Sequence, residues 1–197
     1  MYELLKGGWI MFPLGICSIV AITVIIERFF FFRRIQATAL AEKVLKMVEG
    51  QHMDEAQAIA GQSSLPLIKV LAAGINNRLH PAKAMEAAGI TEMSAMRRGL
   101  PVLDTIVTLS PLLGLLGTII GMINSFQIMA VSGIGQPHAV TGGVAEALIA
   151  TATGITVAVI ALIPYNYFLA RIERETEKIE HYATRLEIAL TTPPVKE

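Results

Sequence analysis

Three apolar stretches, each long enough to cross a lipid bilayer, constrain the fold of this chain more than any other feature. They begin near Trp9, Leu100 and Val144. About 20 residues of α-helix span the hydrocarbon core of a membrane. The chain is 53% hydrophobic and only 16% charged, whereas about one quarter of the residues of a soluble domain are charged. The sequence therefore predicts an all-α membrane protein with three transmembrane helices and long cytoplasmic helical extensions.

Positive charges beside the apolar stretches predict how the chain crosses the membrane. Arg28, Arg33 and Arg34 follow the first stretch, Arg171 and Arg174 follow the third, and the linker between the second and third has no lysine or arginine. The positive-inside rule then places the N-terminus outside and the C-terminus in the cytoplasm. Because the charge follows the first stretch, we interpret that stretch as a retained anchor and not as a cleaved signal peptide. The predicted segments are an external N-terminus (1–8), transmembrane helix 1 (9–32), a cytoplasmic helical bundle (33–99), transmembrane helix 2 (100–131), an external loop (132–143), transmembrane helix 3 (144–170), and a cytoplasmic C-terminal helix and tail (171–197).

The segment between the first two apolar stretches predicts a small helical bundle without catalytic chemistry. Apolar residues recur at helical spacing, with Gly and Pro breaks between about three or four helices. His52 and His80 stand alone at these breaks, which favours solvated histidines over metal ligands. The chain has no HExxH, nucleophile-elbow or Walker pattern, so we expect no enzyme activity, cofactor or metal site. A formal net charge of zero predicts no nucleic-acid partner, and Cys17, as the single cysteine, cannot form an intramolecular disulfide.

Small residues form one face of the second apolar stretch. Gly114, Thr118, Gly121 and Ser125 recur at i, i+4, i+7 and i+11, and Gly117 with Gly121 makes a GxxxG motif. Such faces let two helix backbones approach closely in lipid. Helix packing through the three glycines is the simpler interpretation, and a polar lining of a lumen is the alternative.

Glu146 is an acidic residue near the start of the third apolar stretch. A charge at the bilayer centre costs about 2.5–3.5 kcal/mol. One interpretation is an interfacial side chain that reaches water; the other is a carboxylate in a bundle interior that binds and releases a proton.

Two threonines follow Glu146 on the same helix. At about 100° per residue, Thr153 lies within about 20° of Glu146 around the helix axis, and Thr151 lies about 140° away. A single carboxylate also predicts that the other proton-binding group comes from another polypeptide or from another copy of this chain. Because three helices do not readily enclose a lumen alone, we expect a closed cyclic oligomer.

Two of these stretches resemble a known family. TIVTLSPLLGLLGTIIGMINSF (Thr105–Phe126) and GGVAEALIATATGITVAVIALIPYNYF (Gly142–Phe168) are similar to the signatures of the MotA/TolQ/ExbB proton-channel family, and ERFFFFRR (27–34) is similar to the family's ending of the first span. Three spans with the main soluble part between the first two resemble its ExbB and TolQ members, and the motifs look closer to ExbB.

The resemblance implies a homopentamer in a bacterial inner membrane, in contact with lipid. Its pore would hold the single helices of an ExbD-like partner, and motion driven by protons would pass to a TonB-like protein that powers nutrient import across the outer membrane. The family's pore residues match Glu146, Thr151 and Thr118, to which the helical geometry adds Thr153. Glu146 is then expected to form the wall beside a partner's acidic residue. A TolQ-like subunit of the envelope-maintenance system and a non-conducting membrane scaffold remain alternatives.

Overall fold

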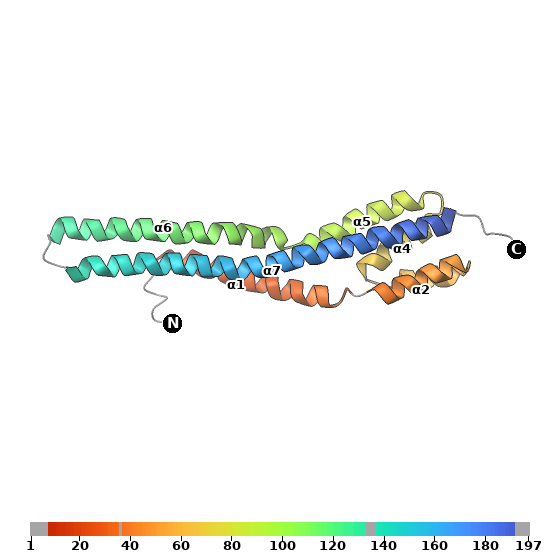
Figure 1. The fold of residues 1–197 in the computed structure, drawn as a ribbon, viewed down its shortest axis with the longest axis horizontal. Helices are drawn as coiled ribbons and strands as arrows, with labels where there is room; N and C mark the ends of the chain where they lie inside the picture. Colours follow the sequence, from red (N-terminus) through yellow and green to blue (C-terminus); the bar gives the residue numbers. More distant parts are fainter. Residues whose placement is uncertain (1–7, 36, 133–136, 192–197) are drawn as a thin grey trace. The chain divides into compact units, whose positions relative to one another are not determined.

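The computed structural model describes residues 8–35, 37–132 and 137–191. These residues form seven α-helices and no β-strand (Figure 1). The helices are α1 (Met11–Arg33), α2 (Thr38–Glu49), α3 (Met53–Gly61), α4 (Pro66–Asn76), α5 (Pro81–Arg97), α6 (Leu100–Ser132) and α7 (Pro137–Thr191). The prediction of an all-α protein is confirmed.

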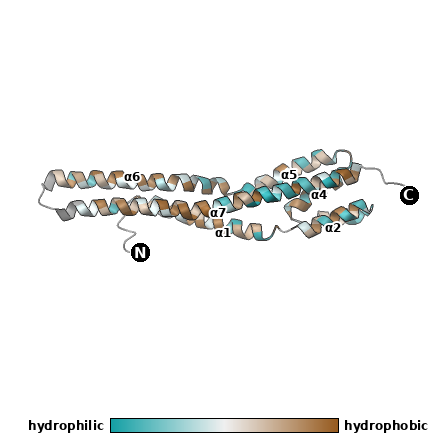
Figure 2. Ribbon diagram, viewed as in Figure 1, coloured by the Kyte–Doolittle hydropathy of each residue, from teal (hydrophilic) through white to brown (hydrophobic). Residues whose placement is uncertain are grey.

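Three of the helices in the described ranges have the length and apolar composition needed to cross a membrane. Their apolar stretches lie in α1, in α6 and in the first part of α7 (Figure 2). Large apolar side chains on all three helices are exposed, including Phe12 at 75%, Phe126 at 57% and Ile163 at 68%. Exposed apolar surface of this extent requires lipid or further protein around it. The prediction of three membrane-crossing helices therefore agrees with the structure in number and kind.

Two helix boundaries depend on residues with special backbone properties. Gly99, between α5 and α6, has φ of +83°, a conformation that L side chains rarely adopt. Helix α7 begins at Pro137, and proline is favoured at the first helical position. This helix therefore starts earlier than the predicted boundary at 144, inside the segment expected to be an external loop. Residues 133–136 of that segment lie outside the described residues, as do 1–7 of the predicted external N-terminus.

The chain divides into two compact units. Unit 1 comprises Met1–Arg28 and Gly99–Phe168, and unit 2 comprises Phe29–Arg98 and Leu169–Glu197. Unit 1 thus contains most of α1, all of α6 and the apolar part of α7. Unit 2 contains α2 to α5 and the charged part of α7. One uninterrupted helix consequently contributes to both units.

The core of unit 2 explains why its short helices are stable. All five helical segments of unit 2 contribute side chains with 1% exposure or less, including Val44 and Leu45 of α2, Ala56 of α3, Ile68, Leu71 and Ile75 of α4, Met96 of α5 and Leu186 of α7. Fully burying one such side chain stabilises a fold by about 1.5–3 kcal/mol. Helix α4 is the most buried of the short helices, since seven of its eleven residues are buried. The last part of α7 therefore belongs to the hydrophobic core of unit 2.

A polar cluster joins α2 to α7 within unit 2. Arg185 Nη1 lies 3.1 Å from Glu42 Oε2, and the Tyr182 hydroxyl donates to the same oxygen at 3.1 Å. The Arg185 guanidinium, helped by the Tyr182 hydroxyl, holds the pKa of Glu42 below its usual value. Burial and the neighbouring Glu42 carboxylate raise the pKa of Tyr182. The cluster thus favours an ionised Glu42 and a neutral Tyr182.

Candidate functional site

Small residues bring α6 and α7 into close contact within unit 1. A Cβ atom on Gly117 would lie 2.5 Å from the Cβ of Ala150, and one on Gly121 would lie 2.9 Å from the Cβ of Ala147. Cβ contacts this short essentially do not occur in proteins, so side chains at these glycines would force the helices apart. We call this contact the α6–α7 seam. It consists of Ser110, Gly114, Gly117, Gly121 and Ser125 on α6 and Gly143, Ala147, Ala150, Thr151 and Gly154 on α7.

The seam is tight enough for backbone atoms to touch. A Cβ on Gly114 would lie 3.0 Å from the Cα of Thr151, and a Cβ on Gly154 would lie 2.5 Å from the carbonyl oxygen of Ser110. Without a hydrophobic driving force between helices in lipid, contacts of this kind supply much of the association energy. The three glycines predicted to serve helix packing, Gly114, Gly117 and Gly121, all lie against α7.

Thr151 links the two helices by a hydrogen bond. Its hydroxyl donates to the carbonyl oxygen of Gly114 at 3.0 Å. The Thr118 hydroxyl donates instead to the Leu115 carbonyl at 2.7 Å, within α6. The Thr153 hydroxyl donates to the Ile149 carbonyl at 2.8 Å, within α7. Both hydroxyls are therefore satisfied by their own helix and retain oxygen lone pairs that can accept a further hydrogen bond.

Glu146 lies near the start of the apolar part of α7 and next to the backbone that precedes α1. Its carboxylate occupies the place where a Cβ on Gly8 would be, and Gly8 has φ of +71°. The side chain is partly buried. Within the described residues, Glu146 makes no ion pair, and none of the hydroxyls of Thr118, Thr151 and Thr153 is hydrogen-bonded to it. The structure of one chain thus places these four predicted site residues in unit 1 but does not join them into one cluster.

Comparison with known proteins assigns the chain to a family. The model of the MotA/TolQ/ExbB proton channel family matches residues 33–181. The chain belongs to this family. The description of the family is that of a proton channel and names no enzyme activity.

Individual relatives carry both ExbB and TolQ names. A putative biopolymer transport protein, ExbB-like 1, of Synechocystis is 36% identical over 197 residues, which cover 94% of this chain and 77% of the relative. The biopolymer transport protein ExbB of Salmonella typhimurium is 33% identical over 152 residues, covering 70% of this chain and 62% of the relative. The Tol-Pal system protein TolQ of Pseudomonas aeruginosa is 44% identical over 92 residues, which cover 47% of this chain and 40% of the relative.

Two residues of this family member belong near the site although sequence reasoning did not select them. Ser110 is fully buried, and its hydroxyl has no hydrogen-bond partner among the described residues. Its position four residues before Gly114 continues the spacing of the small residues, so the same periodicity could have identified it. No sequence pattern identifies Gly8, because its closeness to Glu146 depends on how the chain runs before α1.

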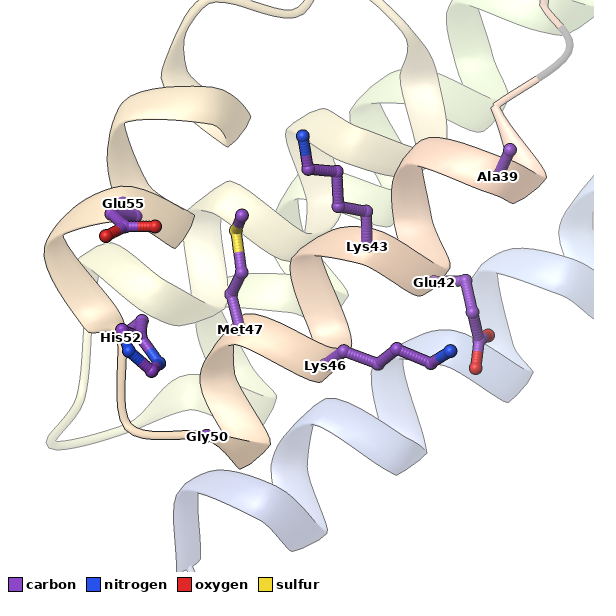
Figure 3. Close-up of a pocket in the computed structure, with 8 residues that line it drawn as sticks. All are labelled: Ala39, Glu42, Lys43, Lys46, Met47, Gly50, His52 and Glu55. Atoms are coloured by element: carbon purple, nitrogen blue, oxygen red, sulfur yellow. The ribbon is translucent and has the colours of Figure 1, made fainter.

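A hollow in unit 2 lies beside α2 and the start of α3. It has a volume of about 640 Å³ and is lined by Ala39, Glu42, Lys43, Lys46, Met47, Gly50, His52 and Glu55 (Figure 3). Its charges are mixed, and Glu42 is already bound by Arg185. No group of three or more His, Cys, Asp or Glu side chains that could hold a metal ion occurs among the described residues.

Proposed function

We propose that this chain is the ExbB-like subunit of a motor in the bacterial inner membrane, driven by the proton-motive force. The motor works with an ExbD-like single-span protein and a TonB-like protein and energises nutrient import across the outer membrane. The N-terminus is periplasmic and the C-terminus cytoplasmic. The observation that carries this proposal is Glu146, a carboxylate in an apolar helix without a basic partner among the described residues.

Oligomerisation explains how Glu146 is tolerated in the membrane. The tight α6–α7 seam closes the space between these two helices, and large apolar side chains of α1, α6 and α7 remain exposed in the described structure. A closed ring of identical chains, here a homopentamer, buries part of that surface and creates a central pore. In the ring, Glu146 faces the pore and not lipid.

The threonines have different roles in this proposal. Thr118 and Thr153 satisfy their own donors and offer oxygen atoms that can accept hydrogen bonds from water along the pore. Thr151 holds α7 to α6 through Gly114, and its place beside the pore follows from the family resemblance. Glu146 forms the wall of the pore beside the acidic residue of the ExbD-like partner, whose protonation drives the motion.

Replacement of Glu146 tests the function in cells. With the ExbD-like and TonB-like partners co-expressed, Glu146→Ala leaves the complex assembled and abolishes energised uptake. Assembly is checked by co-purification and size-exclusion chromatography, and uptake by accumulation of a labelled nutrient. Wild-type uptake by an assembled Glu146→Ala complex would refute the proposal.

A TolQ-like role in envelope maintenance is the second candidate, supported by the 44% identity to TolQ over 92 residues. Genomic neighbours separate the two: a TonB-type gene beside this one supports import, and Tol-Pal genes support envelope maintenance. For a non-conducting scaffold, the third alternative, proton conductance of the purified complex would be the same with Glu146 and with Glu146→Gln.

A further inference from the structure

Unit 2 contains a groove between α5 and the last part of α7. None of the predicted site residues lines this groove. Its volume is about 370 Å³. The lining residues are Val70 of α4, Ala82, Met85, Glu86, Gly89, Ile90 and Met93 of α5, and Thr176, Ile179, Glu180, Ala183, Thr184 and Glu187 of α7.

The groove has a buried apolar base and an exposed apolar residue at its edge. Val70, Met85 and Ile179 lie in it with 5% exposure or less, whereas Ile90 is 59% exposed. A Cβ on Gly89 would meet no atom within 4 Å. The groove therefore has open space above an apolar base, the arrangement that binds apolar side chains of a ligand.

The charged residues of the groove are all acidic. Glu86, Glu180 and Glu187 line it, and no lysine, arginine or histidine does. In the described structure none of these three carboxylates forms an ion pair, whereas two other glutamates of unit 2, Glu42 and Glu175, are paired with Arg185 and Lys178. Unpaired like charges around an apolar base attract a cationic partner and repel nucleic acid and anionic lipid.

The length of the groove suits a helical partner. Its lining runs from Ala82 to Met93 on α5 and from Thr176 to Glu187 on α7, which is about three helical turns, or roughly 16 Å, on each side. Two helices that flank an apolar groove of this length can bind an amphipathic helix by its apolar face.

We propose that the groove binds a basic amphipathic helix of a partner protein, with apolar side chains on the base of the groove and lysines or arginines against the three glutamates. This binding does not depend on Glu146 or on proton flow.

A peptide-binding assay with the full chain in maltoside micelles tests the proposal. The probe is a fluorescein-labelled 18-residue amphipathic peptide with leucines on one face and lysines beside them, and the signal from empty micelles is subtracted. Fluorescence anisotropy is expected to show saturable binding that weakens as salt is added. The same peptide with glutamates in place of lysines is expected not to bind.

Charge reversal locates the binding in the groove. Glu86→Lys, Glu180→Lys and Glu187→Lys together are expected to raise the Kd about tenfold, since three exposed charge pairs each contribute modestly. The matched control is Glu55→Lys, Glu173→Lys and Glu177→Lys, which changes the net charge equally at exposed positions outside the groove. The control is expected to bind as the wild type does. An equal loss in both triple variants would show attraction by net charge alone and would overturn the proposal.

A variant without charge change makes the test independent of electrostatics. Gly89→Trp places a large side chain in the open space of the groove, and replacing a glycine inside a helix does not impair helix formation. This variant is expected to lose peptide binding while its helical circular dichroism is retained. Wild-type affinity in a folded Gly89→Trp variant would overturn the proposal. A second result would also overturn the proposal: the wild type does not bind the peptide but self-associates, and the triple variant of Glu86, Glu180 and Glu187 no longer self-associates. The occupant of the groove would then be a second copy of the chain.

Discussion

Thr151 donates its hydroxyl to Gly114 of the neighbouring helix, so its removal measures one hydrogen bond between α6 and α7. Thr151→Val keeps the side-chain shape and removes the donor, whereas Thr151→Ser keeps the donor. Hydrogen bonds between membrane helices contribute about 0.6 kcal/mol on average and up to about 1.7. We expect Thr151→Val to be destabilised by an amount in this range and Thr151→Ser to be closer to the wild type, by thermal unfolding in detergent. Equal stability of the Val and Ser variants would show that this bond contributes nothing.

Glu42 makes the stability of unit 2 dependent on pH. Its folded-state pKa is lowered by Arg185 from an ordinary value of 4.5, so the ionised form is favoured by folding. The resulting stabilisation is fully present above pH 4.5 and is lost as the pH falls through the lowered pKa. We expect the stability difference between the wild type and Glu42→Gln to shrink progressively below pH 4.5 in acid titrations followed by circular dichroism. A difference that stays constant with pH would contradict this role.

Individual side chains also show where sequence reasoning reached its limit. The helical geometry separated Thr151 from Glu146, but only the packed structure identifies Gly114 as its partner, because that depends on how α6 is rotated. The spacing predicts one face for Thr118, Gly114, Gly121 and Ser125, yet the Thr118 hydroxyl donates to the Leu115 carbonyl of its own helix. The residues of α6 that contact α7 are separated by three or four positions, and the one between Gly114 and Gly121 is Gly117, not Thr118.

At the scale of the elements, the α6–α7 seam depends on the absence of side chains. We expect Gly117→Ile to destabilise the protein by about 1–3 kcal/mol or more, the usual cost of overpacking, because its Cβ would collide with Ala150. Gly142→Ile is the matched control, since a Cβ on Gly142 meets no atom within 4 Å. Thermal unfolding and size-exclusion profiles of both variants give the comparison. Gly117→Ile as stable as Gly142→Ile would mean that the seam is not close-packed.

The helices themselves were largely predictable from the sequence. Apolar stretches of about 20 residues can satisfy their backbone hydrogen bonds in lipid only as helices or closed barrels, and the stretches here are too long for strands. The predicted start of the third span at 144 follows Gly142 and Gly143, which are typical of a loop, whereas the helix α7 itself begins at Pro137. Both glycines are helical, and Gly143 contacts Ser125 in the seam.

At the scale of the whole molecule, α7 is one continuous helix shared by a membrane-type unit and a unit of short helices. The sequence predicted that this helix continues past the membrane, because charged residues follow Phe168 without a Gly or Pro. It could not predict the contact of Gly8 with Glu146 or the groove of unit 2, because both depend on segments far apart in the chain. The single carboxylate predicts an oligomer, but the surfaces through which the copies of the proposed ring would meet do not follow from the pattern of one chain.

Proton flux through the complex with its ExbD-like partner is the most direct test of the role of Glu146. The complex is reconstituted in liposomes, a membrane potential is imposed, and the internal pH is followed with a dye. The matched control is Asp104→Asn, which removes another carboxylate of unit 1, an exposed one near the start of α6. We predict that Glu146→Gln loses most of the flux and that Asp104→Asn conducts as the wild type does. Wild-type flux through an assembled Glu146→Gln complex would contradict the account.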